Sequence, residues 1–133
     1  MCMCLFACSS QKHEISVTVI NENAPQCTND LSDSFLNLEQ SKYIGTTINV
    51  SKDKPYWGML VNNTGNNTIQ IDMGLGENIV LVEPSQSVWI FCDSFFNEGK
   101  YEIGFSSSNT LELNGLAEFW FTDNMSLILP TKE

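Results

Sequence analysis

Residues 87–106 read SVWIFCDSFFNEGKYEIGFS and contain two apolar strand patterns, Val88–Cys92 and Tyr101–Phe105. In the second pattern apolar and polar residues alternate, which is typical of a strand with one buried side and one solvent-facing side. The first pattern is apolar at every position, which favours a strand in the interior of a sheet. Asn97-Glu98-Gly99 between them supplies the glycine that a turn needs. The stretch therefore predicts a β-hairpin at the core of a small all-β domain.

Similar patterns recur on both sides of this hairpin. Strands are expected over Ile15–Ile20, Tyr43–Val50, Tyr56–Val61, Ile69–Met73, Ile79–Val82 and Leu116–Thr122. In the first of these, Ile15, Val17 and Val19 should form the buried side.

The connections between these patterns are rich in turn residues. Asn62–Asn67 predicts a hairpin loop, and Asn114-Gly115 is the strongest short turn signal in the chain. Leu31–Leu38 is open to two interpretations, because Leu31, Phe35 and Leu38 have helical spacing but the segment could equally be a strand.

The number and spacing of these patterns predict the fold class. Roughly nine or ten short strands separated by turns favour a single-domain antiparallel β-sandwich, either Ig-like or jelly-roll-like, over residues 15–130. Residues 1–14 are expected to be an N-terminal tail. A length of 133 residues is enough for one domain with a real hydrophobic core.

Charge excludes one class of partner. Sixteen acidic residues stand against six lysines and no arginine, a formal net charge of −10. A nucleic-acid partner is not expected, because this surface cannot neutralise a row of phosphates. Divalent cations or a basic partner stay open.

The N-terminus suggests how the protein is localised. Leu5-Phe6-Ala7-Cys8, followed by two serines, is similar to the lipobox of a bacterial lipoprotein, in which the cysteine is lipidated. The alternative is a disordered tail with chance cysteines. No stretch approaches the ~18 apolar residues of a membrane-spanning helix, so membrane contact is expected only through a lipid on Cys8. The expected location is extracytoplasmic, where Cys27 and Cys92 could form one disulfide or stay as two thiols.

From Lys54 onward the order of features resembles a family. A strand beginning Tyr56-Trp57 ends in Asn62-Asn63-Thr64-Gly65, and Val82-Glu83-Pro84-Ser85 leads into the opening stretch. Gly99–Ser106 and Leu113-Asn-Gly115-Leu116 follow. This order is similar to small secreted β-sandwich proteins of Gram-positive bacteria, over about residues 54–129. The resemblance implies an extracytoplasmic β-sandwich and no catalytic residues, and it departs at Ser85, where those proteins tend to have glycine.

The sequence offers little for catalysis. His13 is the sole histidine, so no histidine-rich metal site is expected, and no metal or cofactor is predicted. The pairs Glu98 with Glu102 and Glu112 with Glu118 could flank a sugar ring as in a glycoside hydrolase. Charged residues on strands are more often simply the solvent-facing ones.

Aromatic residues are the better indication of function. Phe95-Phe96 lies in a connection, where an apolar pair is either folded under or displayed to a partner. With Tyr56 and Trp57 it could form a platform on which sugar rings stack. The alternative is that the three tryptophans all fill the core.

These observations favour a non-catalytic binding or interaction module of the bacterial cell envelope, with a glycan or an envelope protein as its partner. Two alternatives stay open. The first is a structural subunit of a surface assembly or phage particle, and the second is a carboxylate-dependent glycoside hydrolase.

Overall fold

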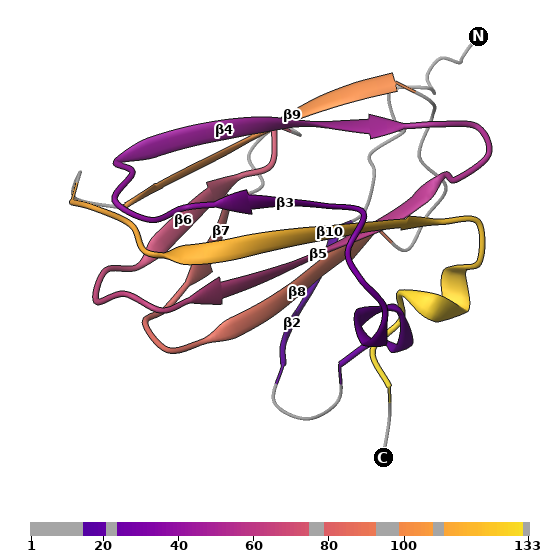
Figure 1. Cartoon of the computed structure of the whole chain (residues 1–133), viewed down its shortest axis with the longest axis horizontal. Helices are drawn as coiled ribbons and strands as arrows, with labels where there is room; N and C mark the ends of the chain where they lie inside the picture. The colour runs from indigo at the N-terminus through magenta and orange to yellow at the C-terminus, as the bar shows by residue number, and fades with distance from the viewer. Residues whose placement is uncertain (1–14, 21–23, 75–78, 93–98, 108–110, 132–133) are drawn as a thin grey trace, which may run out of the picture.

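The computed structural model describes residues 15–20, 24–74, 79–92, 99–107 and 111–131, which form two antiparallel β-sheets packed as a sandwich (Figure 1). The predicted fold class is confirmed. The strands in these ranges are β2 (Ile15–Val19), β3 (Ser34–Asn37), β4 (Tyr43–Val50), β5 (Tyr56–Asn63), β6 (Ile69–Asp72), β7 (Ile79–Val82), β8 (Ser87–Cys92), β9 (Gly99–Ser107) and β10 (Gly115–Thr122).

The strand order is that of a jelly roll with one added strand. One sheet has the order β2-β8-β5-β10-β3, and the other has the order β4-β9-β6-β7. From β3 onward each connection crosses between the sheets, except that β6 and β7 pair with each other as neighbours. Without β2, two interleaved sets of four strands remain, which is the jelly-roll arrangement. Of the two architectures expected, the structure has the jelly roll.

The predicted central hairpin is wrong. β8 lies between β2 and β5 in the five-stranded sheet, whereas β9 pairs with β4 and β6 in the other sheet. The burial pattern of each strand was predicted correctly, but an apolar face is satisfied equally well by a facing sheet as by a neighbouring strand. Asn62–Asn67 was misread for the same reason, since it leads from one sheet to the other.

Asn114-Gly115 is also not a hairpin turn, because Gly115 begins β10. A glycine is needed there for close approach to β5. A Cβ atom on Gly115 would lie 2.3 Å from the carbonyl oxygen of Asn62.

The main core fills the space between the two sheets. In β9, Ile103 and Phe105 are buried while Glu102 and Lys100 are exposed, which confirms the predicted alternation. The long strand β4 contributes Ile48 and Val50 from its inward side. The other buried members include Trp57, Met59, Val61, Ile69, Ile71, Val80, Val82, Val88 and Ile90.

A second apolar cluster lies on the outer face of the five-stranded sheet. The 3-10 helices η2 (Gln26–Asn29) and η3 (Met125–Leu127) lie side by side over this face (Figure 1). Beneath them Trp89 and Trp120 are buried with their ring centroids 5.7 Å apart. Trp89 Nε1 donates a hydrogen bond to the carbonyl of Ile128 at 2.8 Å. β8 is therefore buried on both faces, which explains why it is apolar at every position.

The two edge strands of the five-stranded sheet, β3 and β2, were the ones that the sequence predicted least well. Leu31–Leu38 contains the strand β3 rather than a helix. In β2, Val17 and Val19 are about half exposed, although they were expected to be buried. They lie opposite Ile90 and Val88 on the inward side of the sheet. Because the facing sheet has one strand fewer, we infer that β2 extends past its edge.

Ser85 occupies a backbone conformation that favours glycine. Its φ is 69°, and Glu83-Pro84-Ser85-Gln86 closes with a hydrogen bond from Gln86 N to Glu83 O at 3.0 Å. A turn with proline second and a positive φ third normally places glycine at the third position. This turn thus has a glycine-like geometry although serine occupies its third position.

We expect Ser85→Gly to stabilise the protein. A left-handed conformation costs a residue with a Cβ about 1–2 kcal/mol, part of which is offset by the greater freedom of glycine in the unfolded chain. The expected net gain is therefore about 0.5–1 kcal/mol in urea unfolding. Ser85→Ala, which keeps the Cβ, should bring no gain. A loss of stability in Ser85→Gly would contradict the turn geometry.

Candidate functional site

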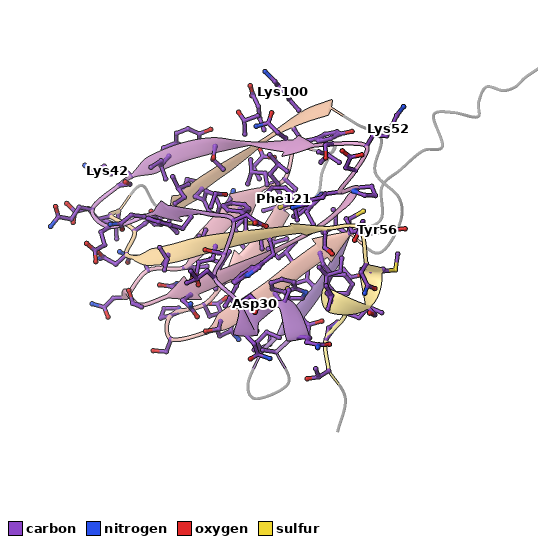
Figure 2. The ribbon with its side chains drawn as sticks, turned by 45° about the vertical axis from the view of Figure 1, so that its right-hand side comes forward. Asp30, Lys42, Lys52, Tyr56, Lys100 and Phe121 are labelled. Carbon is purple, nitrogen blue, oxygen red and sulfur yellow. The ribbon has the colours of Figure 1, made fainter. Side chains whose placement is uncertain are left out.

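The residues predicted to hold a ligand do not form one platform. Trp57 is 1% exposed and packs between the sheets, so a ligand cannot reach its ring. Tyr56, its neighbour in β5, points to the opposite side of the sheet because side chains alternate along a strand. It is half-buried against the outer cluster (Figure 2). Phe95 and Phe96 lie outside the described residues, so their role stays a prediction.

The two cysteines are not paired with each other. Cys92 is a buried thiol in the core between the sheets, whereas Cys27 is a buried thiol in the cluster under η2 and η3. Burial raises the pKa of the Cys27 thiol to about 12, and the nearby Asp30 and Asp33 carboxylates add to this effect. Cys27 therefore stays protonated at neutral pH, and its contribution to stability is lost only as the pH rises from about 9 towards 12. Cys8, the predicted lipidation site, lies outside the described residues.

Within the described ranges, no helix is long and apolar enough to cross a bilayer.

A hollow of about 320 Å³ lies on the outer face of the four-stranded sheet. Gly45 of β4 and Gly104 of β9 face each other across the strand pair and form its floor, because neither carries a side chain. Its walls carry an aromatic ring, a hydroxyl group and two carboxylates. They are Tyr43, Thr47, Asp72 and Glu102.

Tyr43 presents an aromatic ring to solvent beside this floor. Its side chain is 69% exposed although the ring lies close over Gly104. A Cβ atom at position 104 would be 2.7 Å from Tyr43 Oη and 3.1 Å from Cε1. Because Gly104 has no side chain, the Tyr43 ring can pack against the sheet at this position. This leaves its other face open to a ligand.

Two carboxylate residues are neighbours of Gly104 in the sheet, on different sides from Tyr43. Asp72 of β6 is the cross-strand partner of Gly104, and Glu102 precedes Gly104 by two residues on the same side of β9. One oxygen of Asp72 accepts a hydrogen bond from Gly74 N at 2.9 Å, which holds the carboxylate at the rim. Both residues are exposed. Lys100 projects from this side of the sandwich, one alternation further along β9 (Figure 2).

The remaining predicted carboxylates do not gather here. Glu118 lies on β10 between Leu60 and Phe35, in the other sheet, and Glu112 is an exposed residue that precedes β10. Glu98 lies outside the described residues. In the described part of the chain, no group of three or more His, Cys, Asp or Glu residues could hold a metal ion.

Sequence reasoning missed this hollow because it depends on strand pairing. Tyr43, Gly45 and Thr47 do alternate with inward residues along β4, which is visible in the sequence. Gly45 and Gly104, however, become cross-strand neighbours only because β4 pairs with β9, and these two strands are separated by about fifty residues of chain.

Comparison with known proteins adds a distant likeness. No protein-family model matches the chain, and no curated protein matches it. Among solved structures, a family two carbohydrate esterase from Cellvibrio japonicus is similar, with a TM-score of 0.36 and 11% sequence identity. The match covers 90% of this chain and 37% of the esterase chain, so this chain spans well under half of that protein.

Proposed function

We propose that this chain is a non-catalytic, extracytoplasmic glycan-binding module, and that it binds through the hollow on the outer face of its four-stranded sheet. The observation that carries this proposal is the Tyr43 ring, 69% exposed and seated over Gly104 beside two carboxylates. An exposed ring held against the outer face of a sheet has no structural role in the core, and its open face is available to a partner.

The chemistry of the walls suits a sugar. The apolar C–H face of a pyranose ring can stack on an aromatic face, while carboxylate and hydroxyl oxygens accept or donate hydrogen bonds to its hydroxyl groups. Asp72, Glu102 and Thr47 supply such oxygens around the ring of Tyr43. An open site of this kind binds one short glycan weakly, since few contacts offset the cost of association.

The proposal includes attachment to a membrane surface by lipid on Cys8, in keeping with the lipobox-like Leu5–Cys8. Many anchored copies on one surface would bind a polymer by avidity, so weak individual sites would suffice.

Tyr43→Ala should weaken glycan binding about tenfold while the protein stays folded. A ring face of ~50 Å² removed from water contributes about 1–1.5 kcal/mol at roughly 25 cal/mol/Å², which corresponds to that ratio. The measurement is affinity electrophoresis of the full chain in gels that contain neutral plant or bacterial polysaccharides, followed by calorimetry on those that retard it. Circular dichroism checks the fold.

Two further variants test where the site lies. Gly104→Ala should lift the exposed Tyr43 ring and weaken binding, although it leaves the tyrosine in place. Phe35→Ala removes an equally exposed aromatic residue from the other sheet and should leave binding unchanged. If Tyr43→Ala binds like the wild type and Phe95→Ala/Phe96→Ala does not, the site is the loop that the sequence indicated. Retention of binding by all of these variants would rule out both sites.

One observation favours glycoside hydrolysis as a second candidate function. Asp72 and Glu102 border one hollow and are diagonal neighbours on adjacent strands, a relation that places residues about 7–8 Å apart, with their Cβ atoms somewhat closer. Inverting glycosidases separate their carboxyl groups by a similar ~6.5–9.5 Å. Both residues are exposed, however, whereas the acid of such an enzyme is usually held in an apolar setting. Release of reducing ends from a polysaccharide that the chain binds, lost in Glu102→Gln, would establish hydrolysis.

A further inference from the structure

The hollow carries one sign of charge. Its two ionisable carboxylates, Asp72 and Glu102, have no lysine among the other described residues that line it. Two lysines are close to it in sequence: Lys42 directly precedes Tyr43, and Lys100 is two residues from Glu102 on the same side of β9, opposite Asn49. Two strand residues of this spacing lie about 7 Å apart along the backbone, so Lys100 offsets this negative charge only in part. The whole chain adds to it with a net charge of −10.

The carboxylates and the ring point to the same small area. Asp72 reaches Gly104 from β6, Glu102 flanks it along β9, and the Tyr43 ring covers it from the third side. A positively charged group in the hollow beside the Tyr43 ring would therefore lie near two carboxylates and an aromatic ring. An ammonium group can donate to both carboxylates and is attracted by the ring face.

We propose that the hollow selects glycans with free amino groups, such as β-linked glucosamine polymers from which the acetyl groups have been removed, over N-acetylated or uronate-bearing glycans. This inference rests on the proposed glycan-binding function and specifies its substrate class. N-acetylation removes the positive charge and adds bulk above the floor. A uronate brings a third carboxylate towards Asp72 and Glu102, and like charges in one site repel each other.

The test compares three soluble oligosaccharides of equal length by calorimetry with the full chain. They are hexamers of glucosamine, N-acetylglucosamine and galacturonate, measured at pH 6, where a primary amine carries its proton. We expect the glucosamine hexamer to bind about five- to tenfold more tightly than the acetylated one, the ratio that two exposed ion pairs support. The galacturonate hexamer should not bind measurably. The preference should shrink in 0.5 M salt, because exposed charges are screened.

Variants that remove a negative or a positive charge distinguish an effect of the hollow from an effect of the net charge of the protein. Glu102→Gln and Asp72→Asn should each lower the preference about two- to threefold, while Lys100→Gln should raise it. Glu118→Gln changes the net charge equally but lies in the other sheet, so it should have no effect. A preference that falls by the same amount in Glu118→Gln and Glu102→Gln would mean that net charge and not the hollow selects the amine.

Failure of this inference and failure of the proposed function give different results. If the glucosamine and N-acetylglucosamine hexamers bind equally, the amine preference is overturned. If Tyr43→Ala then weakens the binding of both hexamers, the proposed glycan site still stands. Absence of binding to all three hexamers and to every polysaccharide in the electrophoresis panel overturns both. Tight binding of galacturonate would show that the two carboxylates do not face the ligand.

Discussion

Gly58→Ala should destabilise the protein by about 3–5 kcal/mol, a large part of the stability of a domain of this size. A Cβ at position 58 of β5 would lie 2.1 Å from Cζ2 and 2.4 Å from Cη2 of Trp89. These contacts are far inside van der Waals separation, so the indole ring must move. Trp89 is 0% exposed and its Nε1 is bonded to the carbonyl of Ile128. Moving the ring therefore adds the loss of this hydrogen bond to the cost of overpacking.

Urea unfolding followed by tryptophan fluorescence measures this effect. Gly45→Ala is the matched control, because Gly45 is also a strand glycine but a Cβ there meets nothing closer than 3.4 Å. Its cost should stay within about 1 kcal/mol. If Gly58→Ala is too unstable to purify, Gly58→Ala/Trp89→Leu provides the second measurement. Relief of the clash should make the double variant more stable than the sum of its single changes. Equal costs for Gly58→Ala and Gly45→Ala would contradict the packing of Trp89.

The pairing of Gly58 with Trp89 also shows what could be predicted from the sequence. The apolar pattern of β8 predicted an interior strand, and burial of all three tryptophans in the core was one of the two alternatives left open; Trp89 is buried. The pattern did not predict that Trp89 belongs to a second cluster outside the sandwich, under η2 and η3. These short helices contain few residues and have no apolar periodicity, so only their contacts with β8 and β10 identify them as a cover.

Strand existence and burial were predictable because each depends on local alternation. β4, β5 and β9 were found within one or two residues of their expected bounds. Strand partners were not predictable, because in a jelly roll most neighbours in a sheet are far apart in the sequence. For this reason the candidate site was the feature least predictable from the sequence. Tyr43, Gly104 and Asp72 come from three strands and meet only through pairing.

The last prediction compares the two sides of β9. Ile103→Ala should cost about 2–5 kcal/mol, because Ile103 is 2% exposed in the core between the sheets and its truncation leaves a cavity. Glu102→Ala, one residue away on the exposed side, should change stability by no more than about 0.5 kcal/mol. Both variants are measured by urea unfolding, and the soluble fraction of each is then tested against the glucosamine and N-acetylglucosamine hexamers.

The expected results are opposite for the two residues. Ile103→Ala should lose stability yet, in the fraction that remains folded, bind as the wild type does, since its side chain points away from the hollow. Glu102→Ala should keep its stability and show a lower amine preference, since its carboxylate lines the hollow. Equal costs in stability would mean that the alternation of β9 had been misread. A fall in amine preference in folded Ile103→Ala that matches the fall in Glu102→Ala would mean that the hollow depends on the core beneath it. In that case the outer face could not be treated as a separate binding surface.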